Sequence, residues 1–482
     1  MADAVRGRFD ETPSDALAAA ANRSELAAAA ALWEGLAHAD MAHLAVLHAA
    51  GLVDTSTAAG LLDALTGLAA QPPELDPALG DVYVNRFTTL AHRTGGASEV
   101  LHTGRARREA TTVAWHLAVR RRLLDLGATG AGLGRALVDT ADAHRDTMMP
   151  DFTYLHHAQP TTLAHYLLGF SQPLERALHH VAAALGDIDR SPAGIGSVNG
   201  SRLGLDRVLA ADLLEFDGLL TNTRDAMWAA DAAVAAVGAA FGVAMTIDRL
   251  AEDLQVWTTA EFGYLTLADE HSRQSVIMPQ KRNPYALTHL RGQARELVGV
   301  WAGVAASMLT PTGQPDNRVL AHRAVPAAVD TATRAATLAA EVIRGARFHT
   351  DAMADAAATG FTAATDVADL LVSAGLDNRT AHAVVGAAVA AAIAAGDGAL
   401  TSSHLAAAAG EAGVDLPTAE IPHDPAAIVA SRTTIGGAAP GAVAAMIEEQ
   451  RAAFDGHHRF FAGHRLRGFE DRIADRTREA LS

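Results

Sequence analysis

Residues 272–285 read Ser-Arg-Gln-Ser-Val-Ile-Met-Pro-Gln-Lys-Arg-Asn-Pro-Tyr, and this polar stretch opens directly into a long helical pattern. Ser275 is a candidate nucleophile or base, whereas Lys281 and Asn283 could hold an anion near the start of the helix. A serine and a lysine on a loop are common, so their chemistry alone is a weak signal. The helical patterns on both sides of the stretch indicate which kind of fold carries it.

Long Ala-rich patterns make up most of the chain. Half of the 482 residues are apolar, but only 5% are aromatic. Alanine loses little side-chain entropy in a helix, so this composition favours close-packed helices over a sheet. Apolar residues recur at helical spacing over the following ranges: 24–50, 55–70, 105–144, 161–187, 227–257, 287–308 and 326–347. The sequence therefore predicts an all-α fold with a central bundle of long, roughly antiparallel helices.

Glycines interrupt the helical pattern of residues 105–144. Because glycine weakens a helix interior, we expect a kink or a break near the middle of that helix. The glycines in question are Gly127, Gly130, Gly132 and Gly134. No strand-like alternation persists long enough to predict a large sheet. Beyond Phe361, glycines and prolines separate shorter helical patterns, which indicates a smaller terminal domain.

Charge and composition exclude several classes of protein. The formal net charge of -17 argues against broad nucleic-acid affinity. The chain has no cysteine, which excludes disulfides and thiolate ligands and fits a reducing cytoplasm. Residues 1–15 lack an apolar signal core, and no apolar run is long and charge-free enough to span a bilayer. We expect a cytoplasmic protein without a membrane or nucleic-acid partner.

Metal or cofactor chemistry is not predicted. The 22 histidines contain no His-Glu-x-x-His pattern or other recognised ligand spacing. His179-His180 and His457-His458 are simple pairs, which are typical of surface positions. The glycines of residues 194–204 superficially suggest a phosphate loop, but no phosphate-binding motif is present.

A second stretch, residues 102–109, reads His-Thr-Gly-Arg-Ala-Arg-Arg-Glu and combines a glycine turn with clustered cations at a helix start. One interpretation is a solvated first turn of a helix. The other is a carboxylate clamp, because guanidinium groups bind carboxylates through two parallel hydrogen bonds.

Together these stretches resemble a known family. Residues 272–285 resemble the signature loop of the fumarase/aspartase superfamily, Gly-Ser-Ser-x-Met-Pro-x-Lys-x-Asn-Pro, with Gln274 and Val276 in place of the glycine and the second serine. We call residues 272–285 the signature loop. Residues 102–109 resemble the argininosuccinate lyase motif His-Thr-Gly-Arg-Ser-Arg-Asn-Asp. Further matches at residues 158–160, 360–369 and 436–440 follow in order, and the chain is identified as a member of the argininosuccinate lyase branch.

The resemblance implies a mostly helical subunit of three domains, at residues 1–101, 102–355 and 356–482. It implies a homotetramer in which segments from three subunits form each active site, with a small dicarboxylate as substrate and no cofactor. The implied reaction is a β-elimination that releases fumarate. A base removes a proton beside a carboxylate, and the resulting aci-carboxylate dianion then expels the β substituent.

The resemblance also assigns roles to individual residues. Ser275 aligns with the catalytic base, although a free serine hydroxyl is too weak a base unless the folded loop activates it. Cations and hydrogen-bond donors must stabilise the dianion. We expect the following residues to contact the substrate: Asn85, Arg105, Arg107, Arg108, Thr153, Gln159, Ser197, Asn199, Lys281, Asn283 and Arg318.

Several family positions are altered. Tyr154 replaces the usual acid histidine, and Thr288 replaces the glutamate that partners that histidine, so both members of an ion pair are absent together. Tyr154 or the nearby His156 could donate the proton instead. Residues 316–321 lack the family tyrosine and glutamine that contact the arginine portion. Arg108 could bind an additional anionic group, or it could form a surface ion pair with Glu109 or Asp212.

Three functions remain open from the sequence. The first is a carbon–nitrogen lyase that splits an N-substituted aspartate-like compound into fumarate and an amine. The second is an argininosuccinate lyase with a rearranged site. The third is a catalytically silent structural or regulatory relative, against which the retained Ser275, Lys281 and Asn283 argue.

Overall fold

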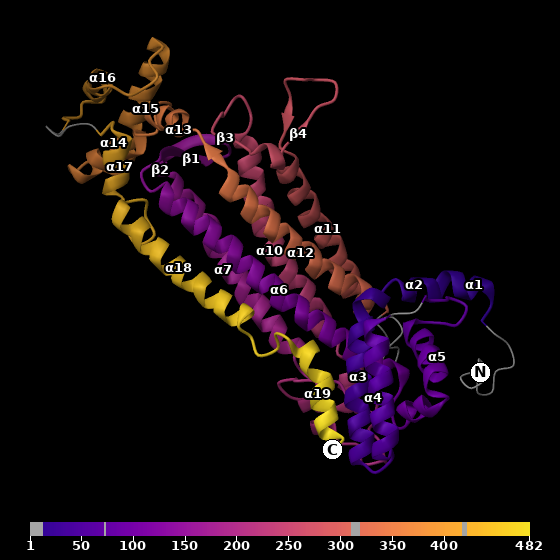
Figure 1. Cartoon of the computed structure of the whole chain (residues 1–482). Helices are drawn as coiled ribbons and strands as arrows, with labels where there is room; N and C mark the ends of the chain where they lie inside the picture. Colours follow the sequence, from indigo (N-terminus) through magenta and orange to yellow (C-terminus); the bar gives the residue numbers. More distant parts are fainter. Residues whose placement is uncertain (1–12, 72–73, 310–318, 417–421) are drawn as a thin grey trace.

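Long helices run side by side through the centre of the molecule (Figure 1). The structure is a computed structural model that describes residues 13–71, 74–309, 319–416 and 422–482. The central helices are α6 (Arg107–Ala143), α7 (Leu163–Ile188), α10 (Asp231–Trp257), α11 (Tyr285–Met308) and α12 (Val319–Gly345). Helix α6 packs on α7 and α12, while α10 packs on α7, α11 and α12. With 37 residues, α6 is about 55 Å long at 1.5 Å per residue.

Strands are few and short in the described part of the chain, so the predicted all-α fold is confirmed. They form three two-stranded antiparallel sheets. The pairs are β1 (Met148–Thr153) with β2 (His156–Thr162), β3 (Leu265–Thr266) with β6 (Arg347–Phe348), and β4 (Arg273–Gln274) with β5 (Arg282–Asn283).

Most of the expected helices are present. Helix α4 (Thr55–Ala70) spans the predicted range, whereas the pattern of residues 24–50 divides into α2 (Arg23–Leu26) and α3 (Ala29–Ala49). The pattern that starts at Met227 also divides, because Ala229 leaves the helical conformation at ψ 109° and α10 starts only at Asp231. Along α10, alanines form half of the buried residues, whereas Met245 of the predicted apolar stripe is 47% exposed.

The expected break in α6 was wrong, since the helix continues without interruption to Ala143. Helix α18 (Pro440–Ala462) supplies the reason. A Cβ atom at Gly127 would overlap the ring of Phe461, and one at Gly134 would overlap the ring of Phe454. The glycines thus admit two buried phenyl rings against the helix axis, and the packing outweighs their low helix propensity.

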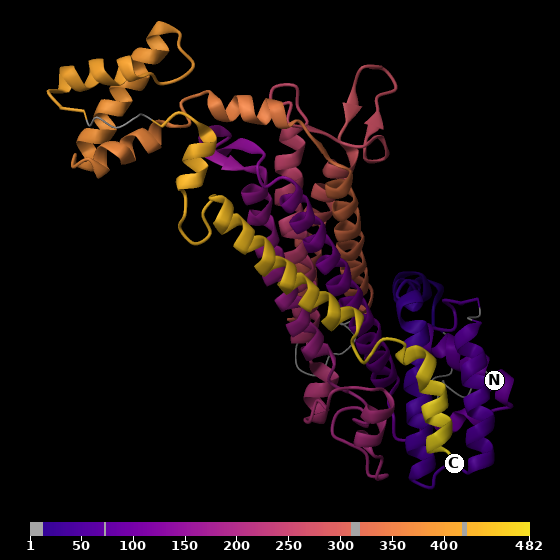
Figure 2. The ribbon, with the colours of Figure 1, turned by 60° about the vertical axis from the view of Figure 1, so that its left-hand side comes forward.

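The N-terminal helices form one end of the molecule. These elements are α1 (Asp15–Leu17), a π-helical turn (Ala18–Asn22), α2, α3, α4, α5 (Val82–Thr94) and a 3-10 segment (Ala97–His102). The C-terminal helix α19 (Phe469–Ala480) returns to this end and packs on α3 and α4 (Figure 2). Short elements complete the central region: α8 (Arg207–Leu213), α9 (Thr223–Trp228) and a 3-10 turn (Asp269–His271).

The segment after α12 divides into two parts. After α13 (Thr350–Ala358), the helices α14 (Ala364–Ser373), α15 (Asn378–Ala395) and α16 (Ser402–Ala412) share a separate apolar core, and α17 (Pro425–Ser431) follows. Helix α18 instead packs along α6 and α7, and side chains of α18 and α19 belong to the main core. The three domain boundaries stay a prediction. Helices α18 and α19 connect the C-terminal segment to the central bundle and to the N-terminal helices.

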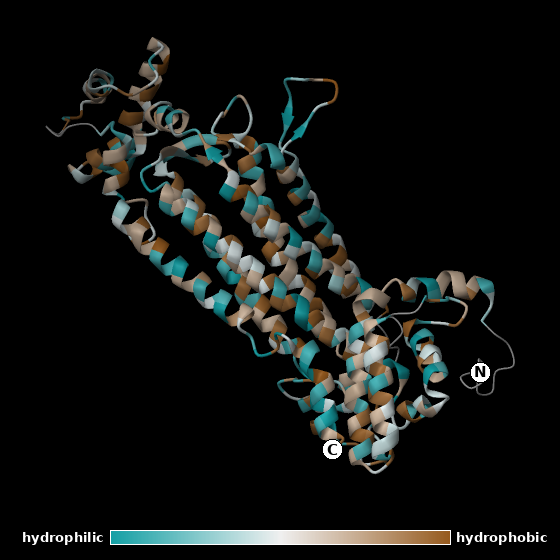
Figure 3. Cartoon of the chain, viewed as in Figure 1, coloured by the Kyte–Doolittle hydropathy of each residue, from teal (hydrophilic) through white to brown (hydrophobic). Residues whose placement is uncertain are grey.

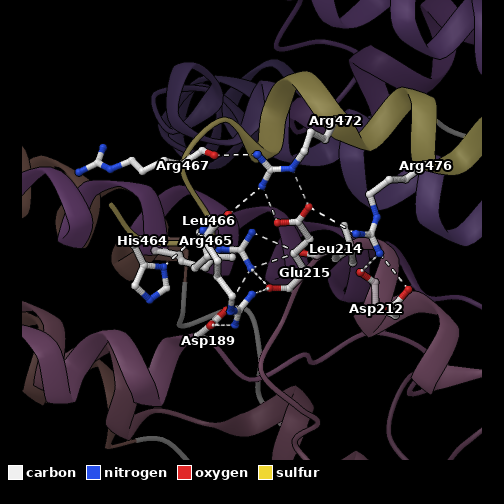
Figure 4. Close-up of polar contacts among 11 residues, drawn as sticks. Asp189, Asp212, Leu214, Glu215, His464, Arg465, Leu466, Arg467, Arg472 and Arg476 are labelled. Carbon is white, nitrogen blue, oxygen red and sulfur yellow. Dashed lines mark hydrogen bonds and ion pairs between the residues drawn. The ribbon is translucent and has the colours of Figure 1, made fainter. Parts of the chain in front are cut away.

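Ion pairs hold residues 465–476, which lead from α18 into α19, against the end of the bundle (Figure 4). Arg465 donates to Asp189 at 2.7 Å, and Arg472 donates to both carboxylate oxygens of Glu215, at 3.0 and 2.7 Å. Helix α10 is the one helix in the described residues that is long and apolar enough to cross a membrane, but it lies packed among α7, α11 and α12.

Candidate active site

The predicted site residues lie at opposite ends of the bundle in one chain. The lower group, at the end of the N-terminal helices in Figure 1, comprises Asn85, Arg105, Arg107, Arg108, Ser197 and Asn199. The upper group comprises Thr153, Tyr154, His156, Gln159, Ser275, Lys281 and Asn283. Helix α7, with 26 residues, separates the hairpin of the upper group from the Ser197 segment by about 40 Å. A single chain therefore does not bring the two groups together.

Arg105 of the lower group is buried rather than open to solvent. Its guanidinium pairs with Asp40 at 2.5 Å, and Arg86 pairs with the other oxygen of the same carboxylate. Burial alone would raise the pKa of Asp40, but the two arginines outweigh it and hold the pKa below its usual range. Asp40 was not predicted from the sequence, because no motif marks it within α3.

His43 supports the turn that precedes this arginine. Its Nε2 lies 3.0 Å from the carbonyl oxygen of Thr103, which can only accept, so Nε2 carries the proton. Burial, and secondarily the charge of Arg105, lowers the pKa of His43 to about 3. The imidazole is therefore neutral and acts as a fixed donor to the residue 102–105 turn.

Asn85 and Arg107 meet at the start of α5. The Asn85 amide donates to the carbonyl oxygens of Asp76, Gly80 and Asp81, and its oxygen accepts from the Asp76 N–H at 2.7 Å. Arg107 is 45% exposed and pairs with the buried Asp81 at 3.1 Å. Asn85 therefore organises the 76–81 loop, which in turn holds Arg107 at the surface.

Glu109 holds the segment that carries Ser197 and Asn199. Its buried carboxylate accepts hydrogen bonds from the N–H groups of Gly194, at 2.7 Å, and Gly196, at 3.1 Å. Burial raises the pKa of Glu109, while Arg105 and these backbone donors oppose the rise. The segment needs such support because Ser197 adopts a left-handed φ of 82°. From the sequence, Glu109 was expected only at a motif position and as a possible ion-pair partner of Arg108, so this positioning role was not predicted.

Arg108 pairs with Glu25 at 3.6 Å, and this partner is neither of the two expected from the sequence. The Arg108 side chain is only 14% exposed, and its partner Glu25 belongs to α2. Asp212 instead pairs with Arg476 of the C-terminal helix. Ion pairing through the folded chain thus connects residues that the sequence pattern could not relate.

The turn of the β1–β2 hairpin presents the upper-group residues to solvent. Tyr154 is 97% exposed, and both Tyr154 and Leu155 adopt left-handed φ angles of 55° and 62°. Such conformations cost of order 1 kcal/mol or more in a non-glycine residue and are concentrated at functional sites. His156 is exposed beside Tyr154, and Thr153 pairs with it across the hairpin. The turn therefore has a defined conformation, but no other described residue of the chain covers its tip.

The signature loop forms a second projecting hairpin. The Ser275 hydroxyl oxygen accepts from the Met278 N–H at 3.1 Å, and the Ser275 N–H donates to the Lys281 carbonyl oxygen at 3.2 Å. Asn283 donates to the Arg273 carbonyl oxygen at 3.0 Å. A backbone donor on the hydroxyl oxygen favours its ionised form, which is what a serine base requires.

The tip of this loop is apolar and lies in solvent. Val276 and Ile277 are fully and largely exposed, and Figure 3 shows the tip in the colour of hydrophobic residues, above hydrophilic strands. At the base of the loop, Thr288 donates to the Pro284 carbonyl oxygen at 3.3 Å and so completes the first turn of α11. Arg318 lies outside the described residues, and its assigned role stays a prediction.

Three potential metal ligands converge elsewhere, midway along α7. Glu175, His179 and His457 place ligand atoms within 4.8 Å of one another. The Nε2 of His179 lies 2.8 Å from Glu175, and burial lowers the pKa of His457. From the sequence both histidine pairs were expected at the surface; His179 is exposed, whereas the side chain of His457 is only 10% exposed where α18 packs on α7.

Comparison with known proteins relates the whole chain to one group of enzymes. Residues 81–299 match the family described as Lyase, and residues 361–417 match the family described as Argininosuccinate lyase C-terminal. An argininosuccinate lyase of Nocardia farcinica is 37% identical over 93% of this chain and 95% of its own length. One of Methanoculleus marisnigri is 35% identical over 86% of this chain and 85% of its own length.

Solved structures agree with this relationship. An EDDS lyase variant with bound fumarate is 26% identical, with a TM-score of 0.85 over 95% of this chain and 93% of that one. A class II fumarase from Schistosoma mansoni shares the fold, with a TM-score of 0.70 at 14% identity over 80% of this chain and 87% of that one.

Proposed function

The chain belongs to the argininosuccinate lyase family of carbon–nitrogen lyases, and we propose that it splits an N-substituted aspartate into fumarate and an amine. The proposal is supported by the preserved Ser275, Lys281 and Asn283 of the signature loop. It is supported further by the structural similarity to an EDDS lyase variant that holds fumarate.

In the proposed reaction, Ser275 removes a proton from the carbon beside one carboxylate of the substrate. The negative charge that develops on this carboxylate is held by Lys281, Asn283 and Arg107, because fixed cations and donors stabilise such an intermediate. The electron pair then forms the double bond of fumarate as the C–N bond breaks. Tyr154 or His156 delivers the proton that the departing amine needs.

The separation of the two groups is the main observation in favour of an active site shared between subunits. Residues that must meet one substrate lie about 40 Å apart in one chain, across the 26 residues of α7. We therefore propose a homotetramer in which the upper groups of neighbouring subunits complete each lower group. Exposed apolar residues on α10 and α11, Met245, Val298 and Trp301, offer the surface for this assembly. Cytoplasmic location stays a prediction.

Hybrid tetramers test the shared site. Ser275→Ala and Arg107→Gln homotetramers should each be inactive with the N-substituted aspartate that the wild type cleaves. When the two variants are coexpressed, roughly a quarter of the sites in random tetramers should carry neither substitution. Recovery of fumarate formation to about that fraction is expected. If each site were built within one chain, every site would keep one substitution and the mixture would stay inactive.

Argininosuccinate itself is the second candidate substrate, favoured by the named relatives. Tyr154 and Thr288 stand against it, because the family's acid histidine and its partner are both replaced. Release of fumarate from argininosuccinate, followed by its absorbance, would establish this activity. Addition of amines to fumarate by the same preparation would establish the broader one, and failure of both would favour a silent relative.

A further inference from the structure

A cavity of about 180 Å³ lies between the start of α6, the segment of residues 197–198 and α9. Arg108, Arg224 and Trp228 line it, together with Ser197 of the lower group. We call it the arginine cavity. It adjoins the predicted substrate site through Ser197, but Arg224 and Trp228 were not among the residues that the sequence analysis singled out.

Arg224 gives the arginine cavity its positive charge, because the charge of Arg108 is offset by its ion pair with Glu25. No carboxylate contributes to its lining, and Arg224 is exposed at the opening, with no hydrogen bond or ion pair from its guanidinium to another described residue. Arg108 approaches from the first turn of α6, a long helix whose N-cap, Ala106, makes no side-chain hydrogen bond. The positive end of this helix dipole adds to the guanidinium charge of Arg224. The cavity is therefore suited to an anion.

The other walls limit what carries that anion. Val198, Met227 and the indole of Trp228 form an apolar lining, which suits a short hydrocarbon chain or a ring rather than a second polar group. Liquid water occupies about 30 Å³ per molecule, so the cavity holds roughly six waters or a chain of a few carbon atoms that ends in a carboxylate.

We propose that the arginine cavity binds a carboxylate on the amine half of the substrate. This inference rests on the proposed function and narrows its substrate class to N-carboxyalkyl aspartates, whose cleavage gives fumarate and an amino acid. Arg224 closes a bidentate contact on the carboxylate, Arg108 supports it from the helix start, and Trp228 packs on the linker. Arg224 is thus a specificity-determining residue, separate from the groups that move protons.

Paired ligands test the cavity without turnover. N-(2-carboxyethyl)aspartate and N-propylaspartate differ only in the terminal carboxylate, and calorimetry on the Ser275→Ala tetramer measures the binding of each. The carboxylated ligand should bind at least about tenfold more tightly, since a charge-assisted pair contributes that much or more. In Ser275→Ala/Arg224→Gln the ratio should fall towards one, while the affinity for N-propylaspartate stays the same.

Arg202→Gln is the matched control. Arg202 is an exposed arginine in the loop that follows Val198, and it lies outside the cavity lining. Equal affinities for the two ligands, or a ratio that Arg224→Gln leaves unchanged, would overturn the cavity assignment. Fumarate release from N-propylaspartate by the wild type tests the reaction separately. Binding that depends on Arg224 without fumarate release from either ligand would reject the reaction and retain the cavity.

Discussion

The lower and upper groups differ in how the chain holds them. In the lower group, Arg105 lies buried on Asp40, and Asn85 is bonded to three backbone carbonyl groups. In the upper group, Tyr154 and Ser275 stand on exposed turns with few bonds to the rest of the chain. The lower group is therefore built by the subunit alone, whereas the upper group is shaped for a surface that one subunit does not provide.

The largest effect is expected from the upper group, in Ser275→Ala. Loss of a general base lowers turnover by about 10²–10⁴-fold, and we expect kcat to fall about 1,000-fold. Because the side chain bonds only within its exposed loop, the free energy of unfolding should change by less than about 0.5 kcal/mol. Fumarate absorbance measures the first quantity and urea denaturation the second.

Ser272→Ala is the control for this substitution. Ser272 lies three residues earlier, and its hydroxyl donates to the Ala268 carbonyl oxygen at 3.0 Å. Its loss should leave kcat within a few-fold of the wild type. Equal losses in the two variants would show that the loop tolerates no change, and the assignment of Ser275 as the base would then have no support.

The lower group should respond in stability instead. Arg105→Gln removes one of two arginines from the buried Asp40, and breaking such a buried pair costs about 3 kcal/mol. Arg107→Gln, two residues along, removes a half-exposed partner of Asp81 and should cost about 1 kcal/mol or less, while lowering turnover by about 100-fold. Urea denaturation midpoints measure the stability of the two variants. A larger loss of stability in Arg107→Gln than in Arg105→Gln would contradict the structural role of Arg105.

The sequence contained more of the fold than of the site. Periodic apolar residues and alanine content predicted the long helices, because those signals are local along the chain. Motif spacing also gave candidates for the reacting residues, such as Ser275 and Lys281, since the reaction restricts residue type, and these assignments stay predictions. The partner of Arg105, the support from Glu109 to residues 194–196 and the cavity at Arg224 depend on contacts between distant segments. No local pattern encodes those contacts.

The same limit explains why a break in α6 was wrongly predicted. A substitution in this helix should have the smallest effect of those considered. Gly134→Ala would place a methyl group against the ring of the buried Phe454, which fills the space beside α6. Overpacking of this kind costs about 1–3 kcal/mol, and it should exceed the gain of about 1 kcal/mol in helix propensity. We expect a net loss of up to about 2 kcal/mol in the free energy of unfolding, measured by urea denaturation.

Gly132→Ala separates packing from propensity in the same helix. A Cβ atom at Gly132 meets no other atom within 4 Å, so this variant should gain up to about 1 kcal/mol. Both variants should keep kcat unchanged, because neither residue belongs to the lower or the upper group. Stabilisation by Gly134→Ala would mean that the Phe454 ring can move aside. The packing of α18 along α6 would then be too loose to hold the two groups rigidly apart.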